Sequence, residues 1–231
     1  MSTHSHSTDP SAAAVPVVPR LETGDCLTRP EFERRYEAMP SLKKAELIDG
    51  VVYVGSPVGP SHADADALFM VWLGTYAVRT PGIRCSANAT VRLDMLNEVQ
   101  PDALLRLVDR GQTSVGKDKP YLEGAPELAA EIASSSVSRD LHAKLNLYLR
   151  HGVREYIVWR VLDGDIDWFR LEDGEYRRLA LGDDGVFRSR EFPGLWLDRA
   201  ALLRGDMAAV LDVLNQGLSS PEHSEFVARQ V

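Results

Sequence analysis

The sequence predicts an α/β protein in which a mixed central β-sheet is flanked by helices. Runs of β-branched and apolar residues alternate with segments of helical periodicity along the chain. The unit at 127–159 reads as strand, helix and strand, which is typical of a right-handed crossover between parallel strands. Asp-Gly pairs predict antiparallel hairpins at 49–50, 163–164 and 173–174. Because parallel and antiparallel connections occur in one chain, we expect the sheet to be mixed.

The individual elements follow from the same patterns. In the first half we expect a helix at 28–38, hairpin strands at 45–48 and 51–54, a helix at 61–79, and strands at 83–86, 90–93 and 103–108. In the second half we expect a polar loop at 109–124, a strand at 127–133, a helix at 138–151, a strand at 155–159, two further hairpin strands, and short helices at 198–203 and 207–215. Residues 1–27 are expected to be a disordered tail, 28–217 the α/β domain, and 218–231 a flexible tail.

The composition limits the possible functions. The chain has 231 residues, which suits one such domain, and a formal net charge of -8. An acidic protein does not attract polyphosphate through its overall field, so nucleic-acid binding would need a local basic surface or bound cations. We find no apolar run of membrane-spanning length, no signal peptide and no metal-type cysteine spacing. These observations favour a cytoplasmic protein that does not enter a membrane.

Two residues are unusual for the core positions that they occupy. Glu131 interrupts an apolar strand, and a buried carboxylate is normally paired or bound to a metal ion. Lys144 lies three residues after Leu141 on the helical stripe that Leu141, Leu145 and Tyr148 define, so it should lean towards the sheet. The alternatives are an edge-strand glutamate that faces water and a lysine that extends outward into solvent.

Asp102 supplies a second carboxylate near the start of a strand, after Pro101. By itself, this Pro-Asp pair is equally typical of a turn. Together, Asp102, Glu131 and Lys144 have a shared chemistry, because carboxylate oxygens suit Mg²⁺ or Mn²⁺ and a lysine can orient water or stabilise an anionic transition state. Such a set favours phosphodiester hydrolysis.

An ordered series of motifs resembles a known family. The series comprises Ala45-Glu46-Leu47-Ile48-Asp49-Gly50, Ser56-Pro57, His62, Val99-Gln100-Pro101-Asp102, Gly124-Ala125-Pro126-Glu127-Leu128, Glu131-Ile132-Ala133-Ser134, Arg139-Asp140, Lys144, Tyr148, Gly152-Val153-Arg154-Glu155-Tyr156 and Phe192-Pro193-Gly194-Leu195. Over about residues 28–204, the chain resembles the Uma-type restriction endonucleases of the PD-(D/E)XK nuclease superfamily.

The resemblance implies a restriction-endonuclease-like core and a role for each motif residue. Asp102 and Glu131 would be the ligands of Mg²⁺ or Mn²⁺, and Lys144 the catalytic lysine. The usual superfamily lysine stands two positions after the acid, where this chain has Ala133, so a lysine from the following helix would replace it. Glu46 and His62 match further family positions near the site. A solvent-facing strand residue and an ordinary first-turn helix residue are the alternatives for these two.

Three hypotheses follow. The first is a Mg²⁺-dependent endonuclease that acts on DNA, with a homodimer suggested by analogy to enzymes that cut both strands. The second is a nuclease-fold protein without catalysis, used in binding or assembly, which the net charge of -8 favours. The third is a hydrolase that acts on small nucleotides with the same ion.

Overall fold

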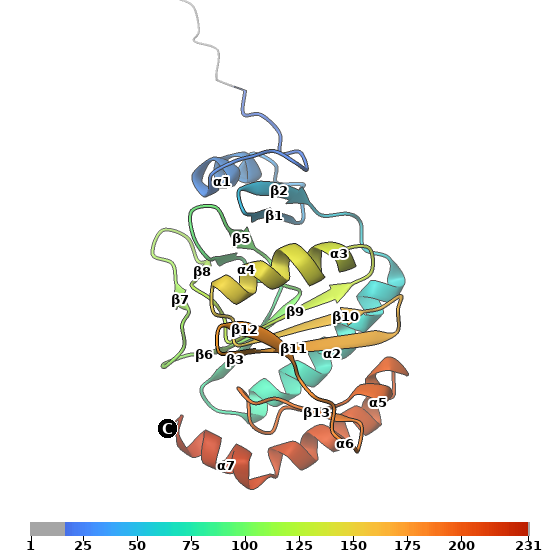
Figure 1. The fold of residues 1–231 in the computed structure, drawn as a ribbon. Helices are drawn as coiled ribbons and strands as arrows, with labels where there is room; N and C mark the ends of the chain where they lie inside the picture. The colour runs from blue at the N-terminus through green and yellow to red at the C-terminus, as the bar shows by residue number, and fades with distance from the viewer. Residues whose placement is uncertain (1–16, 231) are drawn as a thin grey trace, which may run out of the picture.

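A mixed central sheet forms the middle of the molecule (Figure 1). The computed structural model describes residues 17–230, and the strands within that range form two six-stranded sheets and one two-stranded sheet. The central sheet has the order β12 (Glu175–Arg178), β11 (Asp165–Glu172), β10 (Glu155–Arg160), β9 (Leu128–Ala133), β6 (Ala103–Leu107) and β3 (Ile83–Ala87). The second sheet has the order β2 (Val51–Val54), β1 (Ala45–Ile48), β5 (Glu98–Val99), β4 (Val91–Arg92), β8 (Leu122–Glu123) and β7 (Ser114–Val115). Strands β13 (Val186–Arg188) and β14 (Trp196–Asp198) form the third.

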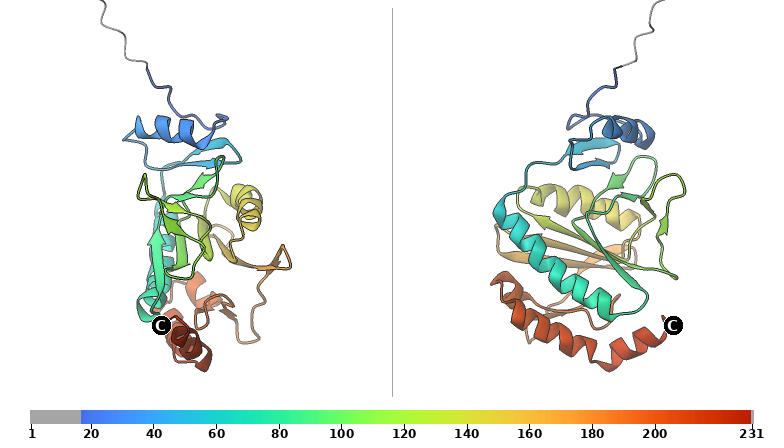
Figure 2. Two further views of the ribbon diagram at one scale, coloured as in Figure 1. Left: turned by 90° about the vertical axis from the view of Figure 1, so that its left-hand side faces the viewer. Right: turned by 180° about the vertical axis from the view of Figure 1, so that it is seen from behind.

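Helices cover both faces of the central sheet (Figures 1 and 2). The helical segments of residues 17–230 are α1 (Arg29–Glu37), α2 (Pro60–Arg79), α3 (Val137–Arg139), a π-helical turn (Asp140–Lys144), α4 (Leu145–Arg150), α5 (Arg199–Leu203), α6 (Met207–Leu218) and α7 (Pro221–Ala228). The α3–α4 segment crosses one face, α2 crosses the other, and α5 to α7 lie along one edge of the molecule.

The central sheet is mixed, as the sequence predicts. Strand β9 pairs with β10 in parallel, and the intervening α3–α4 segment is the predicted crossover. On its other side β9 pairs antiparallel with β6, where Ala103 lies opposite Ala130. The predicted α/β class with a mixed sheet between helices is therefore confirmed.

Strand β9 shows how alternation separates the two cores. Ala130 and Ile132 point to the core on the α2 side, whereas Ala129 and Ala133 point to the core under α4. Glu131 shares the parity of Ala129 and Ala133, so it faces the helix that carries Lys144. The same parity rule places Asp102 with Leu104 on the α4 side of β6.

The β1–β2 hairpin lies above the α3–α4 segment (Figure 1). Its turn residues Asp49 and Gly50 both have positive φ angles, of 51° and 76°, as the predicted Asp-Gly hairpin requires. Leu47 packs in a small core with Phe32 of α1, while Ile48 joins the core under α4. Glu46 has the parity of Ile48, so it points from the hairpin towards the central sheet.

Both predicted tails need correction within the described residues. Residues 1–16 of the expected N-terminal tail lie outside the described range, but Leu21 is buried and Leu27 donates a backbone hydrogen bond to Gly50. The expected flexible C-terminal tail forms helix α7. Phe226 is buried against the main core, and His223 forms a hydrogen bond of 3.0 Å with Thr80. These contacts order segments whose composition is polar.

Two local expectations also differ from the structure. The segment expected as a polar loop at 109–124 contributes strands β7 and β8 to the second sheet. The helix expected at 138–151 contains a π-helical turn, which rotates the buried stripe. Leu147 is therefore fully buried beside Tyr148, whereas Leu145 is only partly buried.

Candidate active site

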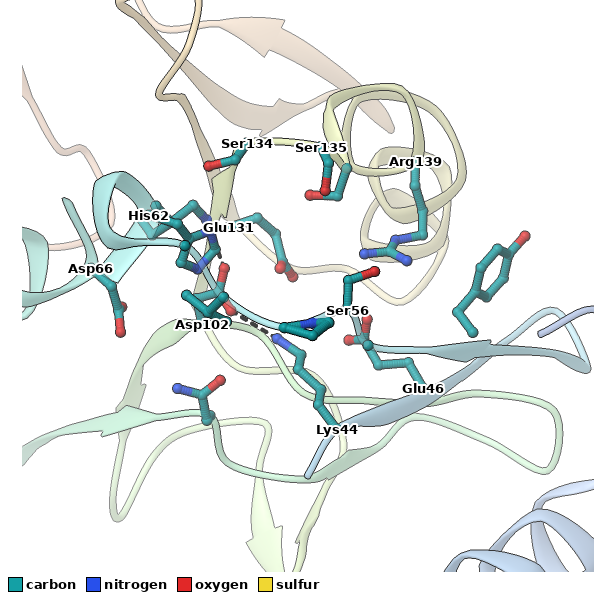
Figure 3. A pocket seen from close by; sticks show the side chains of 18 of the residues that line it. Lys44, Glu46, Ser56, His62, Asp66, Asp102, Glu131, Ser134, Ser135 and Arg139 are labelled. Carbon is teal, nitrogen blue, oxygen red and sulfur yellow. Dashed lines mark hydrogen bonds and ion pairs between the residues drawn. The ribbon is translucent and has the colours of Figure 1, made fainter. Parts of the chain in front are cut away.

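A cleft of about 840 Å³ opens where the β1–β2 hairpin, β6, β9, α2 and the 134–143 segment meet. Figure 3 shows Lys44, Glu46, Asp102 and Glu131 gathered around it, with His62 and Asp66 on one side and Arg139 on another. Further polar residues that line the cleft are Asn88, Ser134, Ser136 and His142. The site thus draws on strands of both large sheets.

Asp102 is held at the entrance to β6 by two contacts. Its Oδ2 accepts a hydrogen bond of 2.8 Å from the backbone N–H of Ile132, and its Oδ1 lies 2.7 Å from Nζ of Lys44. Burial favours the neutral acid, but the positive charges of Lys44 and Lys144 outweigh it and lower the pKa of Asp102. The carboxylate is therefore ionised, and its Oδ1 side faces the cleft.

Glu131 lies next to Asp102 across the strand pair, because the two residues extend the Ala103–Ala130 pairing by one position. Its Oε1 is 2.8 Å from Nζ of Lys144 and accepts a hydrogen bond of 3.1 Å from the Tyr148 hydroxyl. Burial raises the pKa of Glu131 to about 8, although Lys144 opposes the shift. The water-facing edge-strand alternative is excluded, since Glu131 is only 3% exposed.

Lys144 lies beneath the two glutamates. Its Nζ is 2.8 Å from Oε1 of Glu46 and 2.8 Å from Oε1 of Glu131, and the residue has an exposed fraction of 0%. Burial disfavours its charge, but the surrounding carboxylates raise its pKa above the ordinary value. The outward-extending alternative is excluded, and Lys144 approaches the carboxylates from the side of the core.

Glu46 comes from the middle of β1, in the hairpin. It is 2% exposed and accepts a backbone hydrogen bond of 2.8 Å from Gln100 in addition to its pair with Lys144. Burial favours its neutral form, but Lys144 and Lys44 outweigh this effect and lower its pKa. Glu46 therefore ties the hairpin to the central sheet at the site, and the solvent-facing alternative does not hold.

His62 lies in the first turn of α2 and lines the cleft on its outer side. Within residues 17–230, the ion pairs of the site join Lys44 to Asp102 and Lys144 to Glu46 and Glu131, and the His62 imidazole takes part in none of them. The structure thus brings four of the five expected residues into one ionic cluster: Glu46, Asp102, Glu131 and Lys144. His62 stands apart at the rim.

Sequence reasoning missed two cleft residues, Lys44 and Asp66. Lys44 precedes Glu46 by two positions, so strand alternation would place both on one face. Asp66 follows His62 by four positions, which places both on one face of α2. Burial raises the pKa of Asp66, and its Oδ1 is buried with no hydrogen-bond partner among the described residues. Both signals become visible only after Glu46 and His62 are accepted as site residues.

The donor set fits a hard divalent cation with a partly hydrated shell. Asp102 and Glu131 are adjacent carboxylates at a cleft that admits water, and Mg²⁺ is typically bound by one or two carboxylates with several waters. Within residues 17–230, no group of three or more His, Cys, Asp or Glu side chains is arranged to enclose a metal ion. A closed tetrahedral zinc site needs four such ligands, which the pair of Asp102 and Glu131 does not supply.

Comparisons with known proteins identify the family and the fold of the chain. A family model described as "Putative restriction endonuclease" (Uma2) matches residues 29–200, so the chain belongs to this family. The structure is similar to that of a putative nuclease belonging to DUF820 from Anabaena variabilis ATCC 29413, with a TM-score of 0.57 and 12% identity over 74% of this chain and 96% of that one. At this identity the likeness shows the fold, which is restriction-endonuclease-like. A search of the curated proteins found no match.

No helix in the part of the chain that the structure describes is long and apolar enough to cross a membrane.

Proposed function

We propose that this protein is a Mg²⁺-dependent endonuclease that hydrolyses phosphodiester bonds in DNA, with Mn²⁺ as an alternative ion. The observation that carries the proposal is the placement of Asp102 and Glu131 on adjacent strands, with both carboxylates lining one cleft. Membership of a family of putative restriction endonucleases supports the same class of reaction.

In this proposal Asp102 and Glu131 hold the cation. When bound, the ion would supply a more acidic water and would offset negative charge on the phosphate. The backbone N–H of Ile132 orients Asp102, and the Tyr148 hydroxyl orients Glu131. Hydrolysis then needs water to attack phosphorus while the bond to the leaving sugar oxygen breaks and that oxygen takes up a proton.

Lys144 and Glu46 support the metal ligands in this scheme. The sequence suggests that Lys144 itself assists the water or the transition state, and that role stays a prediction. Its burial between Glu46 and Glu131 supports a positioning role, in which it holds Glu131 at the cleft. In this proposal His62 contacts the substrate or the leaving group rather than the cation, and its position at the outer rim of the cleft supports that role.

The cleft offers a local basic rim that can offset the overall charge of -8. Arg139 lies at 5.4 Å over the ring of Tyr53, and His142 lies one turn away on the same segment. Both line the cleft, so a phosphate backbone that enters it would meet the Arg139 guanidinium and the His142 imidazole beside the carboxylates. This rim supports a nucleic-acid substrate over a free nucleotide, because only a polymer would span it.

The test is metal-dependent cleavage of a supercoiled plasmid by the purified protein and its variants. We expect cleavage with Mg²⁺ and a loss of about 10²–10³-fold in Asp102→Asn and Glu131→Gln, the size typical of one transition-state contact. Asp212→Asn, an exposed carboxylate on α6, is the matched control and should cut normally.

Glu131→Gln should also keep its melting temperature in the absence of metal, because Lys144 retains its pair with Glu46 and the repulsion of Glu131 by Asp102 and Glu46 is removed. Equal cleavage by the wild type and both site variants would reject the proposal, since it would trace the activity to contamination. Direct appearance of linear product would indicate a homodimer that cuts both strands, and accumulation of nicked circles would indicate one site acting alone.

A nuclease-fold binding protein without catalysis is the second candidate. The observation that favours it is the contact of Lys44 with Asp102, which already neutralises one proposed metal ligand. This candidate predicts DNA retention in a gel-shift assay without cleavage at any concentration of Mg²⁺ or Mn²⁺. Cleavage that disappears in Asp102→Asn excludes it.

A further inference from the structure

Two lysines approach the same group of carboxylates from opposite sides. Lys144 comes from the core, and its side chain is 1% exposed. Lys44 comes from the start of the hairpin, and its side chain is 28% exposed and lines the cleft. Figure 3 shows the Lys44 ammonium group directed at Asp102 within the cleft. A substrate in the cleft can therefore reach Lys44 directly.

We propose that Lys44 is the catalytic ammonium group that contacts the scissile phosphate, and that it rests on Asp102 when no divalent ion is bound. The inference rests on the proposed nuclease function and adds a residue to that site. In this inference the Lys44–Asp102 ion pair forms in the metal-free protein and breaks when a divalent ion binds.

The backbone of Lys44 is fixed, whereas its side chain is partly exposed, and within residues 17–230 its ammonium group forms an ion pair with Asp102 alone. The Lys44 carbonyl accepts a hydrogen bond of 2.9 Å from the N–H of Gly55. A Cβ atom at Gly55 would lie 3.1 Å from both Cβ and the carbonyl oxygen of Lys44, so the absence of a side chain there permits this close approach. A four-carbon stem on such an anchor can carry the ammonium group across several ångströms of cleft.

Lys44 and a divalent cation would compete for the same oxygen. Oδ2 of Asp102 accepts the hydrogen bond from the fixed backbone N–H of Ile132, so Oδ1 is the oxygen left to coordinate a cation. Nζ of Lys44 lies 2.7 Å from that Oδ1. A bound cation would repel the ammonium group at this distance and would move it towards the open side of the cleft, where a phosphate would lie.

Lys144 cannot take this role without a large cost. Its Nζ contacts both Glu46 and Glu131, and its departure would leave two carboxylates that are 2% and 3% exposed without their cation. Removing one partner of a buried ion pair is strongly unfavourable. Lys144 is therefore a positioning residue, and Lys44 is the lysine of this cluster whose ammonium group is accessible from the cleft.

The experiment compares Lys44→Met, Lys44→Arg and the matched control Lys43→Met, which removes the exposed neighbouring lysine. Mn²⁺ binding to the protein without DNA is measured by titration calorimetry, and cleavage by single-turnover assay. We expect Lys44→Met to bind Mn²⁺ about three- to tenfold more tightly, because the ion displaces no ammonium group. Its cleavage rate should fall about a hundredfold. Lys44→Arg should retain more activity than Lys44→Met, and Lys43→Met should match the wild type.

Each outcome decides the inference. Unchanged Mn²⁺ affinity in Lys44→Met, or a cleavage rate equal to that of Lys43→Met, would overturn the role of Lys44 while the nuclease proposal stands. A wild type that neither binds Mn²⁺ nor cuts would instead overturn the nuclease proposal and this inference with it. Lys44→Gln, which can still donate to Asp102, replaces Lys44→Met if thermal melting shows that the methionine variant does not fold.

Discussion

Carboxylates are buried at both ends of the central sheet, but the groups that contact them differ between the two ends. At one end, Glu127 accepts backbone hydrogen bonds of 2.8 Å from Leu107 and 2.9 Å from Gln112. Its neighbour Glu155, at the start of β10, accepts from the Trp168 indole and the Ser189 hydroxyl, and from two backbone N–H groups. Rigid, uncharged donors therefore satisfy both carboxylates at this end.

At the other end, ammonium groups replace most of those fixed donors. Glu131 contacts Lys144 and the Tyr148 hydroxyl, and Asp102 contacts Lys44 and one backbone N–H. The cleft of about 840 Å³ lies against this end. Burial alone therefore does not distinguish a functional carboxylate from a structural one. The informative difference is whether the partners are fixed donors or side-chain cations beside an open cleft.

The largest effect that tests this contrast is expected for Lys144→Met. The substitution keeps an apolar chain of similar length but leaves Glu46 and Glu131 without their buried cation, at a cost of about 3–5 kcal/mol in unfolding free energy. Urea denaturation at pH 7 measures it, and Lys43→Met is the surface control. A variant as stable as the wild type would show that the two glutamates do not depend on Lys144, and the positioning role would be lost.

A smaller effect is expected at the opposite end for Glu127→Gln. The amide keeps one acceptor oxygen, so either Leu107 or Gln112 loses its partner, which costs about 1–3 kcal/mol of stability. Plasmid cleavage per folded molecule should stay at the wild-type rate, because this end lies away from the cleft. A loss of cleavage without a loss of stability would remove the proposed division between the two ends.

The smallest effect is a dependence on pH at Glu155. Burial raises its pKa, although four donated hydrogen bonds oppose the shift. The folded protein therefore holds this proton more tightly than the unfolded chain does, and the stabilising effect of that proton is lost as pH rises from the unfolded value of 4.5 through the folded one. Stability of Glu155→Gln relative to the wild type should accordingly increase from pH 4.5 to pH 8 in paired urea titrations. A constant difference would contradict this reading.

Much of the fold could be predicted because its signals are local. The Asp49-Gly50 turn, the helical period of α2 and the strand–helix–strand unit around α4 each depend on neighbouring residues. Helix α7 was missed because its sequence is polar, and two buried side chains hold it in place, Phe226 in the main core and His223 against Thr80 and the Tyr76 ring. Because its order depends on contacts with residues distant in the sequence, this segment shows little helical periodicity from which a helix could be predicted.

The candidate site was partly visible for the same reason. Glu131 is conspicuous among apolar neighbours, and Lys144 is conspicuous on an apolar stripe. The π-helical turn altered which leucine is buried, because one extra residue in a turn rotates every later side chain. Lys44 showed no such contrast, since it stands in a polar segment beside Lys43 and its partner Asp102 is 58 residues away.

By itself, the sequence determined the alternation of strands and helices and marked Glu131 and Lys144 as unusual for the positions that they occupy. These properties depend on residue spacing and on the two-residue and 3.6-residue periods of the backbone. Only the tertiary structure decided which cation meets which carboxylate. The β1–β2 hairpin belongs to one sheet and Asp102 and Glu131 to the other. The Lys44–Asp102 and Lys144–Glu46 contacts therefore exist only after the two sheets have packed together.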